Sequence, residues 1–156
     1  MNNFKFEALN HLDFEYLNDL SEAELAENTI KKMKVDQFPG FPCRTTLEDA
    51  RIGETVFLLN YDFHDVSSPY RTGGPVFVRA NQLTKTYAQN KIPVMFNHRL
   101  LSIRGYSKEA MMIFAEVSEG QFLKDRLLQI LENPEIEYLH LHNAKPGCFN
   151  CTVKRI

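Results

Sequence analysis

The sequence lacks the features that mark several large classes of protein. Tryptophan is absent, and 7 glycines and 7 prolines in 156 residues are too few and too scattered for a collagen-like or disordered chain. No apolar run approaches the roughly 18 residues that a membrane-spanning helix needs. The first ten residues mix charged and apolar side chains without the apolar centre of a signal peptide, so we expect a cytoplasmic protein with no membrane partner.

An excess of positive charge is also missing. The 18 Lys and Arg residues are outnumbered by 20 Asp and Glu residues, which gives a net charge of −2. The 12 Phe and 6 Tyr residues fall mostly at core spacings, not beside basic residues, so we expect no nucleic-acid partner. The chain has no Walker loop, G-x-G-x-x-G, H-E-x-x-H or G-x-S-x-G motif, and no cofactor is indicated.

What is present is the composition of one globular domain spanning residues 1–156, with 44% hydrophobic and 24% charged residues. We predict an α+β fold with a mixed, mostly antiparallel sheet of about six strands and two main helices. The sequence leaves the oligomeric state open. Apolar and alternating runs predict strands at 4–9, 55–61, 75–80, 99–106, 111–117, 136–143 and 148–156.

Two capping boxes predict where the helices begin. Ser21 is followed by Glu24, and Ser118 is followed by Gln121. Apolar residues continue at helical spacing after each box: Ala26, Ile30 and Met33 in the first helix, and Leu123, Leu127, Ile130 and Leu131 in the second. The second helix would connect strands 111–117 and 136–143, which we expect to run parallel.

Cysteine is scarce, and the odd count of three in a chain without a secretion signal argues for reduced thiols. Cys148 and Cys151 have the spacing of a redox or zinc motif, but they fall in a predicted strand. Residues three apart in a strand point to opposite faces and lie about 10 Å apart, whereas a disulfide needs Cα atoms within about 7 Å. We therefore expect neither a disulfide nor a metal between them.

The turn at 145–148, with Pro and Gly at its centre, predicts a final hairpin. A hairpin closed by this turn would pair residues across its two strands whose numbers sum to about 293. In this register Cys151 would lie opposite His142 and on the same face as His140. Cys148 would then point to the other face. Two interpretations of the first face are a zinc site completed by Cys43 or His64 and a nucleophilic Cys151–His142 pair. The more ordinary one is a set of strand residues bonded to their neighbours.

Three arginines stand out by their context. Arg44 follows a Pro-rich segment, Arg71 follows Ser-Pro-Tyr in a long loop, and Arg104 lies within a strand. A guanidinium held in this way suits bidentate contact with a carboxylate or phosphate. The alternative is that each arginine pairs with an internal acid such as Asp49, Glu54 or Glu116.

Several strings resemble an uncharacterised bacterial family, the domain of unknown function 1203 (DUF1203), from about Ser21 to the end. The strings are Pro39-Gly-Phe-Pro-Cys-Arg44, Leu58-Leu-Asn-Tyr61, Pro69-Tyr-Arg71, Pro75-Val-Phe-Val78, Arg99-Leu-Leu-Ser-Ile-Arg104 and His142-Asn-Ala-Lys-Pro-Gly-Cys-Phe149. The family implies no activity. Its motif residues would be Cys43, Arg44, Tyr70, Arg71, Arg104, His142, Asn143, Gly147 and Cys148. Relatives often have Ala at the position of Cys151, which argues against a site built on that thiol.

These observations predict a domain that binds a small anionic ligand. The expected ligand-binding residues are Arg44, Tyr70, Arg71, Arg104, His142 and Asn143. Arg44 and Arg104 should point to one site within reach of His142 or Tyr70. His142 and Cys148 are the candidate catalytic residues, although whether the domain is an enzyme stays open. The alternative function is a protein-interaction module without chemistry, in which the arginines form structural ion pairs.

Overall fold

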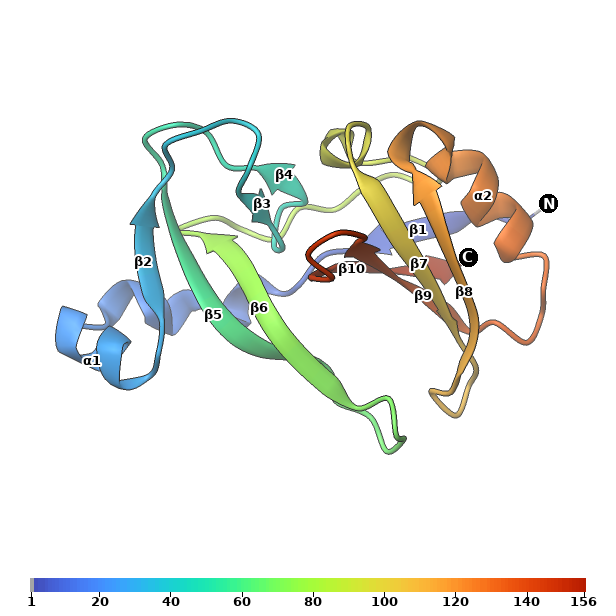
Figure 1. Cartoon of the computed structure of the whole chain (residues 1–156), viewed down its shortest axis with the longest axis horizontal. Coiled ribbons are helices and arrows are strands. Elements are labelled where there is room, and N and C mark those ends of the chain that lie inside the picture. Colours follow the sequence, from blue (N-terminus) through green and yellow to red (C-terminus); the bar gives the residue numbers. More distant parts are fainter. Residues whose placement is uncertain (1) are drawn as a thin grey trace.

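The computed structural model describes residues 2–156, which form two five-stranded sheets lying side by side (Figure 1). The C-terminal sheet has the order β1 (Phe4–Glu7), β10 (Phe149–Arg155), β9 (Tyr138–Asn143), β7 (Leu100–Tyr106) and β8 (Met112–Glu119). The N-terminal sheet has the order β2 (Lys31–Lys34), β5 (Thr55–His64), β6 (Thr72–Arg79), β3 (Pro42–Cys43) and β4 (Glu48–Asp49).

The α+β class and the mostly antiparallel pairing are as predicted, but the prediction of a single sheet of about six strands is inexact. Within residues 2–156, β3 and β6 form the one parallel pair, through Cys43 and Phe77. The early strands β5 and β6 pair with each other, and the strands after residue 99 pair among themselves and with β1. Hydrophobic periodicity locates strands, but it does not say which strands pair, and this is why the division was missed.

The predicted hairpin at 99–106 and 111–117 is confirmed as β7 and β8. Strands β8 and β9 both run antiparallel to β7 and lie on either side of it, so they are parallel in direction without being neighbours. The first residue of β1, Phe4, pairs with the last residue of β10, Arg155. The two termini therefore lie on the same side of the molecule in Figure 1.

The first capping box is confirmed at α1 (Glu22–Glu27), where Ser21 and Glu24 exchange both hydrogen bonds. The helix ends sooner than predicted, because Thr29 has a positive φ of 55° and Met33 belongs to β2. The second box is wrong: Ser118 lies in β8 and its hydroxyl donates to the Glu119 carbonyl. The helix α2 (Leu123–Ile130) follows the 3₁₀ turn Gly120–Phe122. The described residues contain three more 3₁₀ turns, at His11–Asp13, Glu15–Asp19 and Val94–Phe96.

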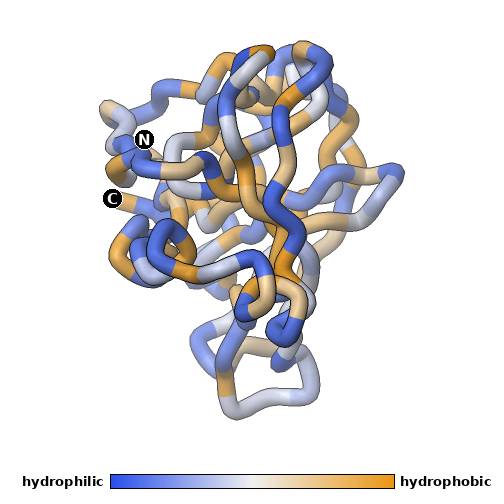
Figure 2. The backbone as a smooth tube through the Cα atoms, turned by 90° about the vertical axis from the view of Figure 1, so that its left-hand side faces the viewer, coloured by the Kyte–Doolittle hydropathy of each residue, from blue (hydrophilic) through white to orange (hydrophobic). Residues whose placement is uncertain are grey.

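Each sheet has its own apolar core. The apolar face of the C-terminal sheet, with Leu101, Ile103, Leu139 and Leu141, packs against Leu127 and its neighbours in α2. A second cluster joins β5 and β6 to α1 and the preceding 3₁₀ turns. Figure 2 shows hydrophobic and hydrophilic stretches following one another along the backbone. Among the described residues, neither helix is long and apolar enough to span a membrane.

Candidate functional site

The second face of the C-terminal sheet is polar and aromatic, and it turns toward the N-terminal sheet. Because side chains alternate along a strand, the residues between the core leucines and isoleucine all point to this face. Three cross-strand pairs from β7 and β9 make it up: Ser102 with His142, Arg104 with His140, and Tyr106 with Tyr138. Phe63 and His64 at the end of β5 pack onto it from the other sheet.

The predicted register of the last hairpin is wrong by about one residue. Phe149 pairs with His142 and Cys151 pairs with Leu141, with an irregularity between them. A bulge adds one residue to a strand, and a shift of one residue moves a side chain to the opposite face. Cys151 therefore points into the core, so both the zinc site and the Cys151–His142 pair lose their geometry. No group of three or more His, Cys, Asp or Glu residues within 2–156 is arranged to hold a metal ion.

A cavity of about 200 Å³ lies between the two sheets. The sequence predicted three of the residues that line it, namely Arg104, His142 and Cys148. The others come from β5, the start of β6 and the final hairpin: Phe63, Thr72, Gly73, Gly74, Pro75, Pro146, Gly147 and Phe149. Arg104 is the one charged residue among them.

His142 is held in one tautomer. Its side chain is nearly inaccessible, with a relative exposure of 2%, and its Nδ1 lies 2.9 Å from the Gly147 carbonyl oxygen. A carbonyl only accepts, so Nδ1 carries the proton and donates it. The φ of 80° at Gly147, which suits glycine, lets the turn bring this carbonyl back to the ring.

The other ring nitrogen of His142, Nε2, is buried and has a lone pair that no group of the described residues uses. Burial, together with the positive charges of Arg104 and Arg44, lowers the pKa of His142 to about 4, although the Gly147 hydrogen bond acts in the opposite direction. The ring is therefore neutral near pH 7, and Nε2 can only accept a hydrogen bond.

Arg104 has no carboxylate partner in the described part of the chain. Its Nε donates to the Ser102 hydroxyl at 3.3 Å, and the structure shows no ion pair for its guanidinium. Three other arginines, Arg79, Arg99 and Arg126, each pair with at least one acid. Arg104 thus presents an uncompensated positive charge to the cavity.

Arg44 lies behind the cavity rather than on its wall. The residue has a relative exposure of 2%, and it donates from Nε to the Phe149 carbonyl at 2.8 Å and from Nη1 to the Pro42 carbonyl at 2.6 Å. Burial lowers its pKa to about 10, so it stays charged near pH 7. The positive charges of Arg104 and Arg44 both contribute to lowering the pKa of His142.

The remaining predicted residues are placed differently. Tyr70 offers its backbone carbonyl to His64 Nδ1 at 2.8 Å and packs its ring near Tyr106, without lining the cavity. Arg71 pairs with Asp65 at the surface, where both side chains are 68% exposed. Asn143 accepts a hydrogen bond from Asn150 and lines a different cavity.

A family comparison now adds to this geometry. The profile described as "Protein of unknown function (DUF1203)" matches residues 40–155, which is most of the chain. The chain belongs to the DUF1203 family. The match includes every residue that lines the cavity. No curated protein and no solved structure matches the chain.

Sequence reasoning about this DUF1203 domain missed two residues that join its sheets. Strand β5 continues past the predicted end at residue 61, so Phe63 stacks on Phe149 with ring centroids 4.4 Å apart. His64, which the sequence suggested only as a possible zinc ligand, is buried and accepts a hydrogen bond from the Tyr138 hydroxyl at 2.6 Å. The alternation Tyr138, His140, His142 was visible in the sequence, but nothing in it indicated that residue 64 would meet residue 138.

We expect Tyr138→Phe to destabilise the protein by about 1–2 kcal/mol, because His64 Nε2 would remain buried without its donor. Urea denaturation would measure the loss. Tyr16→Phe is the matched control, since Tyr16 is 50% exposed and should change stability little. Equal stability of the two variants would show that the hydroxyl does not hold the sheets together.

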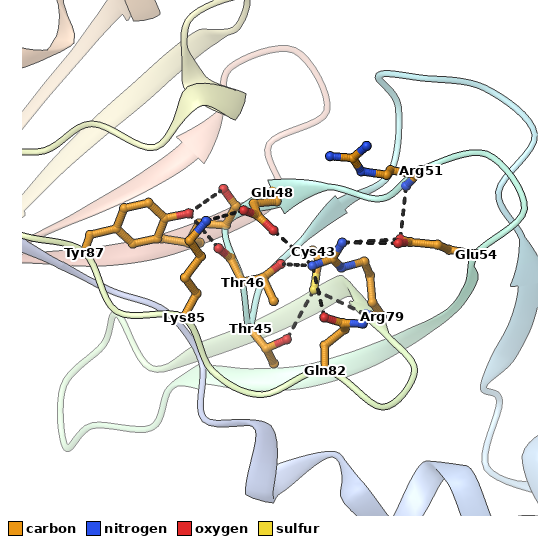
Figure 3. A network of polar contacts seen from close by, with 11 residues as sticks. Cys43, Thr45, Thr46, Glu48, Arg51, Glu54, Arg79, Gln82, Lys85 and Tyr87 are labelled. Carbon is orange, nitrogen blue, oxygen red and sulfur yellow. Dashed lines mark hydrogen bonds and ion pairs between the residues drawn. The ribbon is translucent and has the colours of Figure 1, made fainter.

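A second polar cluster in the DUF1203 domain surrounds Arg79 and is internally balanced (Figure 3). Its guanidinium contacts Glu48, Glu54 and the Thr46 hydroxyl. Below it, the Cys43 sulfur lies 3.2 Å from the Thr45 hydroxyl and is fully buried. Matched charges and a closed thiol indicate a structural role.

Proposed function

We propose that this domain binds a small anion in the cavity between its sheets, with Arg104 as the contact for the negative charge. The observation that carries the proposal is the unpaired guanidinium on the wall of an otherwise uncharged cavity. A partly buried charge without a partner is costly, and an anion would offset that cost.

The surroundings of Arg104 favour such a contact. Phe63 and Phe149 form an apolar wall of the cavity, and charge–charge attraction grows as water is excluded. Arg44 adds a second positive charge near His142, and none of the lining residues is acidic within residues 2–156. His142 adds a neutral imidazole that can accept a hydrogen bond from the ligand, and its pKa of about 4 makes it a weak base near pH 7.

Cys148 provides a natural reporter of binding. It lies on the cavity wall and is partly accessible, whereas Cys43 and Cys151 are fully buried. We expect iodoacetamide to label one thiol per native chain, at Cys148, and phosphate to slow this labelling several-fold. Intact-mass and peptide mass spectrometry would measure both the number of labels and their position.

The decisive variant is Arg104→Met. We expect it to abolish phosphate protection of Cys148 and to cost less than about 1 kcal/mol of stability, because no internal ion pair is broken. Arg51→Met removes the same charge from an exposed position beyond β4 and should leave protection unchanged. If phosphate protects Cys148 equally in Arg104→Met, or does not protect it in the wild type, the proposal fails.

A second candidate function is a protein-interaction module. Strand β8 lies at the edge of the C-terminal sheet and exposes Ile113 and Val117. An exposed apolar edge of this kind favours association with another strand. This function gives Arg104 no ligand, so it predicts that phosphate has no effect on Cys148 and that Val117→Lys alters association.

A further inference from the structure

We propose that the ligand of this cavity carries a hydroxyl group beside its anionic group, and that the hydroxyl donates a hydrogen bond to His142 Nε2 while the anionic oxygens contact Arg104. This inference rests on the proposed function and specifies its ligand class. Inorganic hydrogen phosphate and small 2-hydroxy carboxylates share this chemistry.

The tautomer of His142 carries the argument. Nδ1 is committed as a donor to the Gly147 carbonyl, and Nε2 is left as a buried acceptor without a partner in residues 2–156. A fully deprotonated anion offers only acceptor oxygens. Such an anion would accept hydrogen bonds from Arg104, but it has no donor for the lone pair of His142 Nε2. A ligand with one O–H satisfies both groups. A site built to hydrogen-bond a ligand hydroxyl binds an analogue that lacks the hydroxyl much more weakly.

The donor is a hydroxyl rather than an ammonium because of the nearby charges. Arg104 lines the cavity, and Arg44 lies close enough to His142 to affect its protonation. His64 and His140 also lie near the ring and bring no negative charge, and the Cys148 thiol lines the same cavity. An ammonium group would be repelled by the two guanidinium groups, whereas a neutral hydroxyl would not.

The size of the cavity limits the ligand further. At about 200 Å³ it has room for an ion the size of hydrogen phosphate or of a short 2-hydroxy carboxylate.

Titration calorimetry with matched anion pairs tests the inference on the intact protein. At mildly alkaline pH, phosphate carries two negative charges and one hydroxyl, and sulfate carries two charges and none. Glycolate and acetate, at one charge each, differ by the same hydroxyl, and glycine replaces that hydroxyl with an ammonium. We expect at least tenfold tighter binding for phosphate over sulfate and for glycolate over acetate, with glycine weakest. A preference confined to one pair would identify whether phosphate or a hydroxy acid is the ligand.

His142→Asn removes the Nε2 acceptor and keeps a donor near the Gly147 carbonyl. We expect it to bind both members of each pair with similar affinity, close to that of the wild type for sulfate or acetate. Equal binding of the paired anions to the wild type would overturn this inference while leaving anion binding at Arg104 intact. Binding of none of the anions would overturn the proposed function as well, and the wild-type comparison stands even if the variant fails to fold.

Discussion

We expect the protein to lose stability steeply as the pH falls from about 6.5 toward 4, because two buried histidines must gain protons when it unfolds. Burial, with smaller effects from His64, His142 and Arg104, lowers the pKa of His140 to about 3, and the pKa of His142 is lowered to about 4. In the unfolded chain both return to about 6.5. The unfolded state therefore binds more protons across this range, and stability falls with falling pH.

The effect is large relative to the stability of a domain of this size. Fully developed, the loss of stability is on the order of 5 kcal/mol for His140 and about 3 kcal/mol for His142, because one pKa unit corresponds to about 1.4 kcal/mol. A domain is usually stable by about 5–15 kcal/mol, so the pair accounts for a substantial part of the total. The loss should begin near pH 6.5, at the unfolded pKa, and level off below the folded values.

Urea denaturation between about pH 7.5 and pH 5 would measure this slope before most carboxylates titrate. His140→Gln and His142→Asn should each flatten it, whatever their effect on stability at neutral pH. His98→Gln is the control for a histidine outside this cluster: the His98 side chain is 45% exposed, and its Nε2 lies 3.4 Å from the Asp49 carboxylate. A flat wild-type profile over this interval would mean that the two rings are protonated in the native state.

The fold could be predicted from the sequence only as far as local patterns extend. Alternating and apolar runs located the β7–β8 hairpin and the apolar side of α2, and the Ser21–Glu24 pair located the start of α1. The end of α1 was missed because its apolar spacing continues through Ile30 into β2. The division into two sheets depends on which strands pair over long distances, and local periodicity carries no such information.

The candidate site shows the same limit. Arg104 was identified from its strand context, His142 from the final hairpin and the family resemblance, and Cys148 from the resemblance alone. The structure places all three on one cavity, although the predicted register pointed Cys148 to the face opposite His142. Cys151 was assigned to the wrong face because one irregularity between Phe149 and Cys151 shifts the register. That bulge has no strong sequence signature, since neither glycine nor proline occurs within it.

The second large effect concerns Arg44, for which we expect Arg44→Ala to destabilise the protein by about 3 kcal/mol. The substitution would leave the buried carbonyls of Phe149 and Pro42 without their donor, at about 1–3 kcal/mol each, and would open a void. Part of this loss is offset, because burial opposes the charge of Arg44 and lowers its pKa to about 10. The net effect is still a loss, since the guanidinium joins β3 of one sheet to β10 of the other.

Arg44→Met separates the two contributions, because it fills most of the volume and donates no hydrogen bond. We expect its cost to lie between that of Arg44→Ala and that of Arg51→Ala, the exposed control, which should be near zero. Urea denaturation of the three variants and of Arg104→Met would assign the two arginines different roles. Removing Arg44, which would maintain the wall that carries His142 and Cys148, should lower stability measurably. Removing Arg104, which would bind the anion, should lower stability hardly at all. A loss for Arg104→Met as large as that for Arg44→Met would make both arginines structural and would favour the interaction module.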